Sequence, residues 1–394
     1  MTFAHLPDLG PIADQRPHDA LREAAKRPLR VKLGIDPTAS GIHLGFAVVL
    51  RALRAFQDAG HTAVLIVGDA TARVGDPSGK DKTRPLLTDA EVRANAATYL
   101  DQIGRILDME SAEVRFNSTW FDALSFQEVI ALCGQVTVAQ VLARDSTRQR
   151  LDAGAPVGLH ELVYPVMQAF DSVQVRADVE LGGSDQLFNL MMGRDLQPRF
   201  GQAPQIAVMM PLLVGLDGTR KMSKSYGNTI GITEPPEEQF GKVMSIPDEA
   251  VPQWLELAAG LSPDEARTVL AQGPLAAKRA LASRVVERCH GPDAADTARA
   301  HFERVVVCGG IPTDLPEHPL TGTPVGVVAL VAELAGVSRS QARRLMQQGA
   351  VRLGEERLQD LEARRCFRDG DVLQTGRRRW HRLRVPLDEG SGPS

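Results

Sequence analysis

The first half of the chain alternates short apolar runs with segments of helical periodicity. Residues 31–35 and 62–67 are apolar runs of strand length. Between them, apolar side chains recur at helical spacing from Leu50 to Phe56, and Gly60 follows as a helix stop. A strand, a helix and a second strand in this order predict a βαβ unit and therefore a parallel sheet.

Later segments extend this pattern. Residues 88–149 and 162–170 favour helices, and residues 206–214 favour another strand before a turn at Asp217-Gly218. Residues 235–304 are mostly helical in pattern, with acidic and alanine-rich segments. The first half of the chain is thus typical of an α/β domain, and a helical region follows it.

The end of the chain differs in composition. Four prolines and three glycines among residues 309–324 predict a linker. Residues 325–348 then favour two short helices, and residues 351–385 favour short strands around glycines. The expected parts are a parallel-sheet α/β domain at 1–232, a helical domain at 233–308, a linker at 309–323, a small α+β domain at 324–386 and a disordered tail at 387–394.

Composition and charge exclude several classes of protein. The four cysteines have no metal-ligand spacing, which argues against a zinc site or a disulfide framework. The chain begins without a signal-like segment and has no apolar run of about 18 residues, so we expect a cytoplasmic protein. Residues 338–385 contain thirteen arginines and six acidic residues, a formal charge of +7, which leaves −11 on the rest of a chain of net charge −4. Such a basic end favours a polyanionic partner, although a solvated charged surface is the alternative.

A glycine-rich turn follows the first expected strand. It reads Gly34-Ile35-Asp36-Pro37-Thr38-Ala39-Ser40-Gly41-Ile42-His43-Leu44-Gly45 and opens the next helix. Free backbone N–H groups and the positive helix end can hold phosphate there, and Gly45 allows a nucleotide to approach the backbone. His43 would lie in the first turn, where it can donate to a phosphate oxygen. A capped helix with an incidental histidine is the alternative.

A second cationic segment follows the expected strand at 206–214. It reads Lys221-Met222-Ser223-Lys224-Ser225. Two lysines spaced by small hydroxyl residues can grip a polyphosphate, and more tightly as charge develops on transfer. A lone pair of lysines at this spacing is common and usually only solvated, but the full string is much rarer.

A third group of residues has the chemistry of an amino-acid site. Tyr164, Gln168 and Asp171 are spaced to share one helix face, and Asp76 lies in a Gly-Asp-Pro turn. Two carboxylates, an amide and a phenol can together bind an ammonium group and a hydroxyl. Taken alone, such a face is more often ordinary surface polarity.

The two cationic segments together resemble the signature sequences of class I aminoacyl-tRNA synthetases. Within that class the chain resembles the bacterial tyrosyl-tRNA synthetases with a complete Lys-Met-Ser-Lys-Ser loop, over nearly its whole length. Besides Gly34-Ile35-Asp36-Pro37-Thr38, the resemblance is carried by Gly75-Asp76-Pro77-Ser78-Gly79-Lys80, by Tyr164 to Asp171, by Gly182-Gly183-Ser184-Asp185-Gln186 and by Glu234-Pro235-Pro236-Glu237-Glu238. It implies a Rossmann-like catalytic domain that ends in this loop.

The resemblance also implies substrates and site residues. The enzyme would join tyrosine to ATP, release pyrophosphate, and pass tyrosine to the terminal ribose of tRNA(Tyr). Tyrosine would be bound by Asp76, Tyr164 and Gln168 at its amino group, by Asp171 at its phenol and by Gln186 near its carboxylate. The catalytic phosphate-binding groups would be Thr38, His43, Lys80, Arg84, Lys221 and Lys224. The rest of ATP would be bound by Asp36, Gly45, Gly183, Asp185 at the ribose, Met222, Ser223 and Ser225.

Further expectations concern partners. Magnesium should accompany ATP, and we expect no protein-bound metal and no organic cofactor. The chain should form a homodimer and should not associate with a membrane. The C-terminal domain resembles the α-L RNA-binding domain of ribosomal proteins. The arginines that would bind tRNA are Arg339, Arg343, Arg344, Arg377, Arg378, Arg379 and Arg382.

Two positions depart from the family pattern. Phe46 stands where the helix signature usually has a second histidine, which affects nucleotide contacts. Lys32 stands where many relatives have a tyrosine that helps Asp171 to bind the phenol. Three alternatives share part of this pattern. A tryptophanyl-tRNA synthetase lacks the basic domain and the Tyr164/Gln168/Asp171 set, and a small nucleotidylyltransferase lacks the second loop. A non-catalytic RNA-binding paralogue is the alternative that Phe46 raises.

Overall fold

A computed structural model describes most of the chain. The described residues are 8–38, 41–76, 88–307, 315–320, 324–354, 356–376 and 379–385. Lys80, Arg84, Arg377, Arg378 and the expected tail at 387–394 lie outside them. The chain divides into two compact units, Met1–Arg299 and Ala300–Ser394.

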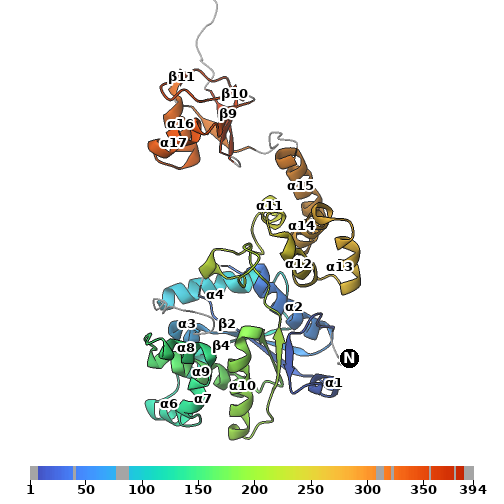
Figure 1. The fold of residues 1–394 in the computed structure, drawn as a ribbon. Helices are drawn as coiled ribbons and strands as arrows, with labels where there is room; N and C mark the ends of the chain where they lie inside the picture. The colour runs from blue at the N-terminus through green and yellow to red at the C-terminus, as the bar shows by residue number, and fades with distance from the viewer. Residues whose placement is uncertain are drawn as a thin grey trace, which may run out of the picture. The chain divides into compact units, whose positions relative to one another are not determined.

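The first unit is built on one six-stranded sheet (Figure 1). In sheet order its strands are β1 (Asp14–Arg16), β6 (Ile206–Met210), β5 (Val179–Gly183), β2 (Arg30–Ile35), β3 (Thr62–Val67) and β4 (Glu113–Phe116). All neighbours pair in parallel except β1, which runs antiparallel to β6 at the edge. The predicted α/β fold with a parallel sheet is confirmed, and the βαβ unit is β2, helix α2 (Leu44–Asp58) and β3.

Three strands of this sheet, the edge strands β1 and β4 and the central strand β5, are not predicted by the sequence pattern. The region at 88–149 has helical patterns but contains β4, whose residues are only half-buried or exposed because it is an edge strand. The central strand β5 was missed because its apolar run is broken by Glu180, which is nevertheless fully buried. The strand expected at 206–214 ends at Met210, and Val214 forms only an isolated bridge to Lys221.

Helices cover both faces of the sheet. The connection from β2 to β3 and the connection from β5 to β6 run in opposite directions along the sheet, so right-handed crossovers place α2 and α10 on opposite faces. Figure 1 shows α2 on one side and α9 and α10 on the other. The helices of this part are α1 (Ala20–Ala24), α3 (Asp69–Val74), α4 (Asp89–Ile103), α5 (Ser118–Phe121), α6 (Phe126–Cys133), α7 (Val138–Leu142), α8 (Asp145–Asp152), α9 (Leu159–Val175) and α10 (Leu187–Leu196).

The segment after the second signature is helical, as expected. Its helices are α11 (Pro236–Met244), α12 (Val251–Leu257), α13 (Pro263–Leu270), α14 (Pro274–His290) and α15 (Pro292–Phe302). Several begin with proline in the first turn, where the missing N–H costs no hydrogen bond. Trp254, Phe240 and Leu281 are completely buried in this region.

The second unit contains a small α+β domain. Helices α16 (Val327–Ala335) and α17 (Arg339–Gln347) confirm the two expected helices. They accompany a five-stranded sheet of β10 (Glu356–Arg357), β9 (Val351–Leu353), β12 (Val372–Thr375), β13 (Trp380–Arg384) and β7 (Glu317–Pro319), and a short pair, β8 (Val325–Gly326) with β11 (Arg364–Arg365). Strand β7 lies within the linker expected at 309–323 but pairs in parallel with β13, so this part of the segment belongs to the C-terminal sheet. No helix among the described residues has the length and apolar character needed to cross a membrane.

Candidate active site

A cavity of about 310 Å³ opens where the sheet reverses its strand order, at the carboxyl ends of β2 and β5. This is where ligands bind in open α/β sheets, because the loops diverge there. Fifteen of the residues predicted from the sequence line it: Asp36, Thr38, His43, Gly45, Asp76, Tyr164, Gln168, Asp171, Gly183, Asp185, Gln186, Lys221, Met222, Ser223 and Lys224. Ser225 is exposed and outside this lining.

The first signature segment caps helix α2. His43 is its N-cap residue, and His43 Nδ1 accepts a hydrogen bond from Phe46 N at 3.3 Å. Burial, with a smaller contribution from the charge of Lys224, lowers the pKa of His43 to about 4. The ring is therefore neutral near pH 7, and because Nδ1 accepts, its proton lies on Nε2, from where it can be donated to a phosphate oxygen.

Gly45 and Met222 bring the two signature segments together. Gly45 N lies 3.3 Å from Met222 Sδ. A Cβ atom on Gly45 would lie 3.2 Å from His43 Nδ1 and 3.3 Å from Met222 Cβ. A side chain at Gly45 would therefore disturb both segments, and the glycine keeps the start of α2 accessible.

The second signature segment carries two lysines at the cavity. Lys221 Nζ lies 2.5 Å from Asp185 Oδ2, the residue expected at the ribose. Lys224 Nζ lies 3.4 Å from Tyr99 Oη and 5.2 Å from the centre of that ring. Asn228 holds this loop in place, because its Oδ1 accepts a hydrogen bond from Ser223 N at 2.9 Å. Sequence reasoning missed Tyr99 and Asn228, which have no motif of their own.

The amino-acid side of the cavity is organised around Asp36 and Asp76. Tyr164 Oη donates to Asp36 Oδ2 at 2.9 Å, and Thr71 Oγ1 donates to Asp36 Oδ1 at 2.8 Å. Gln186 Nε2 donates to Asp76 Oδ2 at 2.9 Å. Burial and the charge of Asp36 raise the pKa of Tyr164 well above its ordinary value, so the phenol stays a donor. Asp36, which is predicted to bind ATP, thus contacts Tyr164, which is predicted to bind the substrate tyrosine.

Asp171 lies at the buried end of the same helix face. The residue is 3% exposed, and its carboxylate accepts hydrogen bonds from Trp120 Nε1 at 3.0 Å and from Asn117 Nδ2 at 3.3 Å. Burial raises the pKa of Asp171 to about 7, against the opposing effects of the Lys32 charge and the two hydrogen bonds. Trp120 and Asn117 were missed because they follow β4, a strand that the sequence pattern did not reveal.

The geometry can be compared with known proteins. Residues 24–306 match the family described as tRNA synthetases class I (W and Y). The chain belongs to this family. It is 48% identical over 386 residues to a tyrosine–tRNA ligase of Salinibacter ruber, covering 94% of this chain and 93% of the relative. A tyrosine–tRNA ligase of Moorella thermoacetica is also 48% identical, over 91% of this chain and 89% of its own length.

Solved structures share the fold of this synthetase. A C-terminally truncated mitochondrial tyrosyl-tRNA synthetase of Aspergillus nidulans has a TM-score of 0.64 at 23% identity, covering 75% of this chain and 92% of its own. A tyrosyl-tRNA synthetase of Archaeoglobus fulgidus, complexed with L-tyrosine, has a TM-score of 0.59 at 23% identity, over 73% and 96%. A tryptophanyl-tRNA synthetase of Aeropyrum pernix has a TM-score of 0.55 at 20% identity, covering 73% of this chain and 84% of its own. The fold alone therefore does not distinguish synthetases for the two amino acids.

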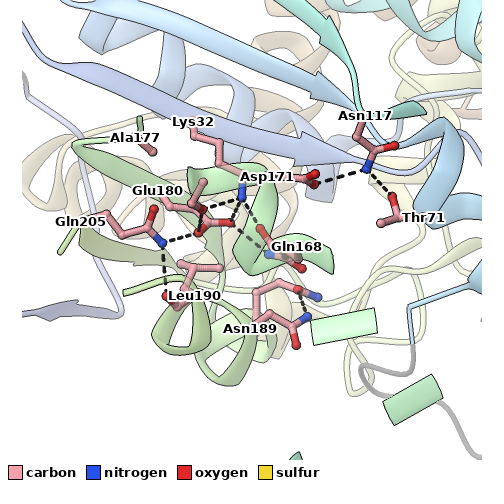
Figure 2. A network of polar contacts seen from close by, with 12 residues as sticks. Lys32, Thr71, Asn117, Gln168, Asp171, Ala177, Glu180, Asn189, Leu190 and Gln205 are labelled. Atoms are coloured by element: carbon pink, nitrogen blue, oxygen red, sulfur yellow. Dashed lines mark hydrogen bonds and ion pairs between the residues drawn. The ribbon is translucent and has the colours of Figure 1, made fainter. Parts of the chain in front are cut away.

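The structure explains one departure from the family pattern. Lys32 is fully buried, and its Nζ lies 2.9 Å from Glu180 Oε1. Figure 2 shows the two side chains turned toward each other. Its ammonium group also donates to Ser172 Oγ and to the main-chain oxygen of Gln168. Lys32 is therefore engaged beneath helix α9, and the side-chain contacts of Asp171 come from Trp120 and Asn117 instead.

The arginines expected at RNA lie in the second unit. Arg339, Arg343 and Arg344 are exposed on α17. Arg379 Nη1 donates to the main-chain oxygen of Ala335, and Arg382 is half-buried on β13. Across the described ranges, no group of three or more His, Cys, Asp or Glu is arranged to hold a metal ion.

Proposed function

We propose that this synthetase is a tyrosine–tRNA ligase whose two reactions take place in the cavity at the strand reversal. The observation that carries the proposal is the set of side chains on α9. Tyr164, Gln168 and Asp171 line the same cavity as His43 and Lys224 of the two signature segments. An amino acid and the phosphates of ATP can thus be held side by side, which supplies most of what an adenylation step needs.

In the first step, a carboxylate oxygen of tyrosine attacks the α-phosphorus of ATP, and the bond to the pyrophosphate oxygen breaks. Thr38, His43 Nε2–H, Lys221 and Lys224 stabilise the charge that moves onto the leaving phosphates. Mg²⁺ enters with ATP as part of the substrate. In the second step, a hydroxyl of the terminal ribose of tRNA attacks the tyrosyl carbonyl carbon and AMP leaves. Neither step forms a bond to the protein.

Amino-acid-dependent exchange of pyrophosphate into ATP, measured across all twenty amino acids, tests this function. Tyrosine alone should support exchange. Exchange with tryptophan instead would move the chain to the other branch of its family. Absence of exchange with every amino acid, together with intact RNA binding, would favour the non-catalytic paralogue.

We also propose that the chain acts as a homodimer in the cytoplasm. Four large apolar side chains are exposed on neighbouring helices of the first unit: Phe126 by 79%, Ile130 by 56%, Val138 by 71% and Leu159 by 78%. Large apolar side chains exposed on adjoining helices are typical of an interface between proteins. Sedimentation of the full chain should give twice the monomer mass. Phe126→Ser combined with Ile130→Ser should shift it to monomer, whereas the same exchange at exposed Leu275, on α14, should not.

A further inference from the structure

A buried ion pair without an assigned role lies beneath the amino-acid side of the cavity (Figure 2). The side chains of Lys32 and Glu180 are 0% and 1% exposed and lie 2.9 Å apart. Lys32 Nζ also donates to the Gln168 main-chain oxygen and to Ser172 Oγ, both at 2.8 Å. An ammonium group has three protons, and all three have acceptors within the protein.

Glu180 is surrounded by donors. Its Oε1 accepts from Lys32 Nζ and from Gln168 Nε2, the latter at 3.0 Å. Its Oε2 accepts from Ser172 Oγ at 3.1 Å and from Gln205 Nε2 at 2.5 Å. An ionised carboxylate can only accept hydrogen bonds, so each neighbour must turn a donor toward it.

This requirement fixes the polarity of the Gln168 amide. If the amide were reversed, its oxygen would face the Glu180 carboxylate in a site without water to screen the repulsion. The nitrogen is therefore held on Glu180, and the amide oxygen is left to accept a hydrogen bond. Gln168 also lines the cavity, where an acceptor is what an ammonium group requires.

We propose that Glu180 is a positioning residue, which orients the Gln168 amide so that its oxygen receives the ammonium group of the amino acid, while Lys32 balances the buried charge. The inference rests on the proposed function, because it assumes that Gln168 meets the amino group of tyrosine. Lys32 and Glu180 themselves do not contact the substrate. Their effect is on the selection of a ligand that carries an α-ammonium group.

Binding of two ligands to the full chain tests this role. Tyrosine is compared with desaminotyrosine, which keeps the phenol and the carboxylate but lacks the ammonium, and both dissociation constants are measured by calorimetry without ATP. The variant is Lys32→Met with Glu180→Gln, which removes both charges so that neither is buried alone. Tyrosine should bind about 10-fold to 100-fold more weakly, and desaminotyrosine within about twofold of the parent.

Ser172→Ala is the matched control. It removes a hydrogen bond from the other carboxylate oxygen and one acceptor of Lys32, but leaves the contact between Gln168 and Glu180 in place. The ratio of the two dissociation constants should therefore not change. Equal weakening of both ligands by the double variant would overturn the proposal, since it would indicate a merely structural role.

A variant at the cavity gives an independent readout if the double variant does not fold. Gln168→Met should lose the same preference for tyrosine over desaminotyrosine. If the double variant does fold, adding Gln168→Met to it should cause no further loss of this preference, because both changes remove the same contact. Retained preference in Gln168→Met would also overturn the proposal. Failure of the proposed function shows separately, as absent pyrophosphate exchange by a parent protein that still binds tyrosine.

Discussion

At the scale of single residues, Asp171 illustrates how burial sets chemistry. The hydrogen bonds from Trp120 and Asn117 favour its ionised form, but burial has the larger effect and raises its pKa to about 7. A group with a raised pKa is protonated below that value and ionised above it. A phenol donates well to a carboxylate, so an ionised Asp171 is the form that binds tyrosine.

The kcat/KM for tyrosine should therefore rise with pH through about 7. In Asp171→Asn this inflection should disappear, and kcat/KM should fall by about 10-fold to 100-fold while the KM for ATP changes little. Pyrophosphate exchange over a range of pH measures both effects. An inflection that persists in the variant would assign it to another group.

Phe46 is the residue at which this chain leaves the signature pattern. Its backbone N–H donates to His43 Nδ1, and the residue is part of the cavity lining. A histidine there would add one charge-assisted hydrogen bond to the nucleotide, about 1.5–3 kcal/mol. We expect the parent to be active and Phe46→His to be equal or faster in tyrosine-dependent exchange. Exchange that is absent in the parent and restored in the variant would contradict this expectation.

At the scale of elements, the loop of residues 221–225 is held by contacts that a substrate can replace. Lys221 is paired with Asp185, and Lys224 lies near Tyr99, so both charges have partners before ATP arrives. The start of α2 is instead fixed by its own cap at His43. The start of α2 is thus held in place before ATP binds, whereas the lysines of the loop can exchange their present partners for the charge that develops on ATP.

Lys224→Ala should accordingly lower the rate constant of adenylation by about 100-fold and change ATP affinity little. Single-turnover kinetics separates these two quantities. Lys278→Ala is a suitable control, because Lys278 is paired with Asp248 and neither residue lines the cavity. An effect limited to the KM for ATP would show that Lys224 acts in ground-state binding only.

At the scale of the whole molecule, the candidate active-site cavity and the exposed arginines of α17 lie in different compact units. The cavity lies within Met1–Arg299, and the exposed arginines of α17 lie within Ala300–Ser394. Strand β7 belongs to the C-terminal sheet, so a truncation that separates the two must end before it.

A chain that ends at Val307 should retain most tyrosine-dependent pyrophosphate exchange and lose most tRNA charging. Charging by the full chain should also fall steeply with salt, because phosphate contacts release counterions. The matched control is the full chain with Arg339, Arg343 and Arg344 replaced by alanine, which should weaken charging without affecting exchange. Equal charging by the truncated and full chains would contradict an RNA-binding role for the second unit.

The sequence by itself determined the parallel sheet and the two signature segments. Both are local: the strand at 62–67 was predicted with the bounds that β3 has, and helix caps and loops are set by neighbouring residues. Helical spacing predicted that Tyr164, Gln168 and Asp171 share one helix face, and the family resemblance predicted that this face belongs to a binding site. The three residues do line one cavity.

Only the tertiary structure decided which partners these residues have. Asp36 belongs to the segment predicted to bind phosphate, but its carboxylate accepts a hydrogen bond from Tyr164, and Lys32 pairs with Glu180. These contacts join segments far apart in the chain, and no local pattern encodes them. Strand β5 also could not be predicted locally, because the buried Glu180 breaks the apolar pattern by which a strand is predicted. The burial of this glutamate is tolerable only with Lys32 and the three other donors that the fold brings to it.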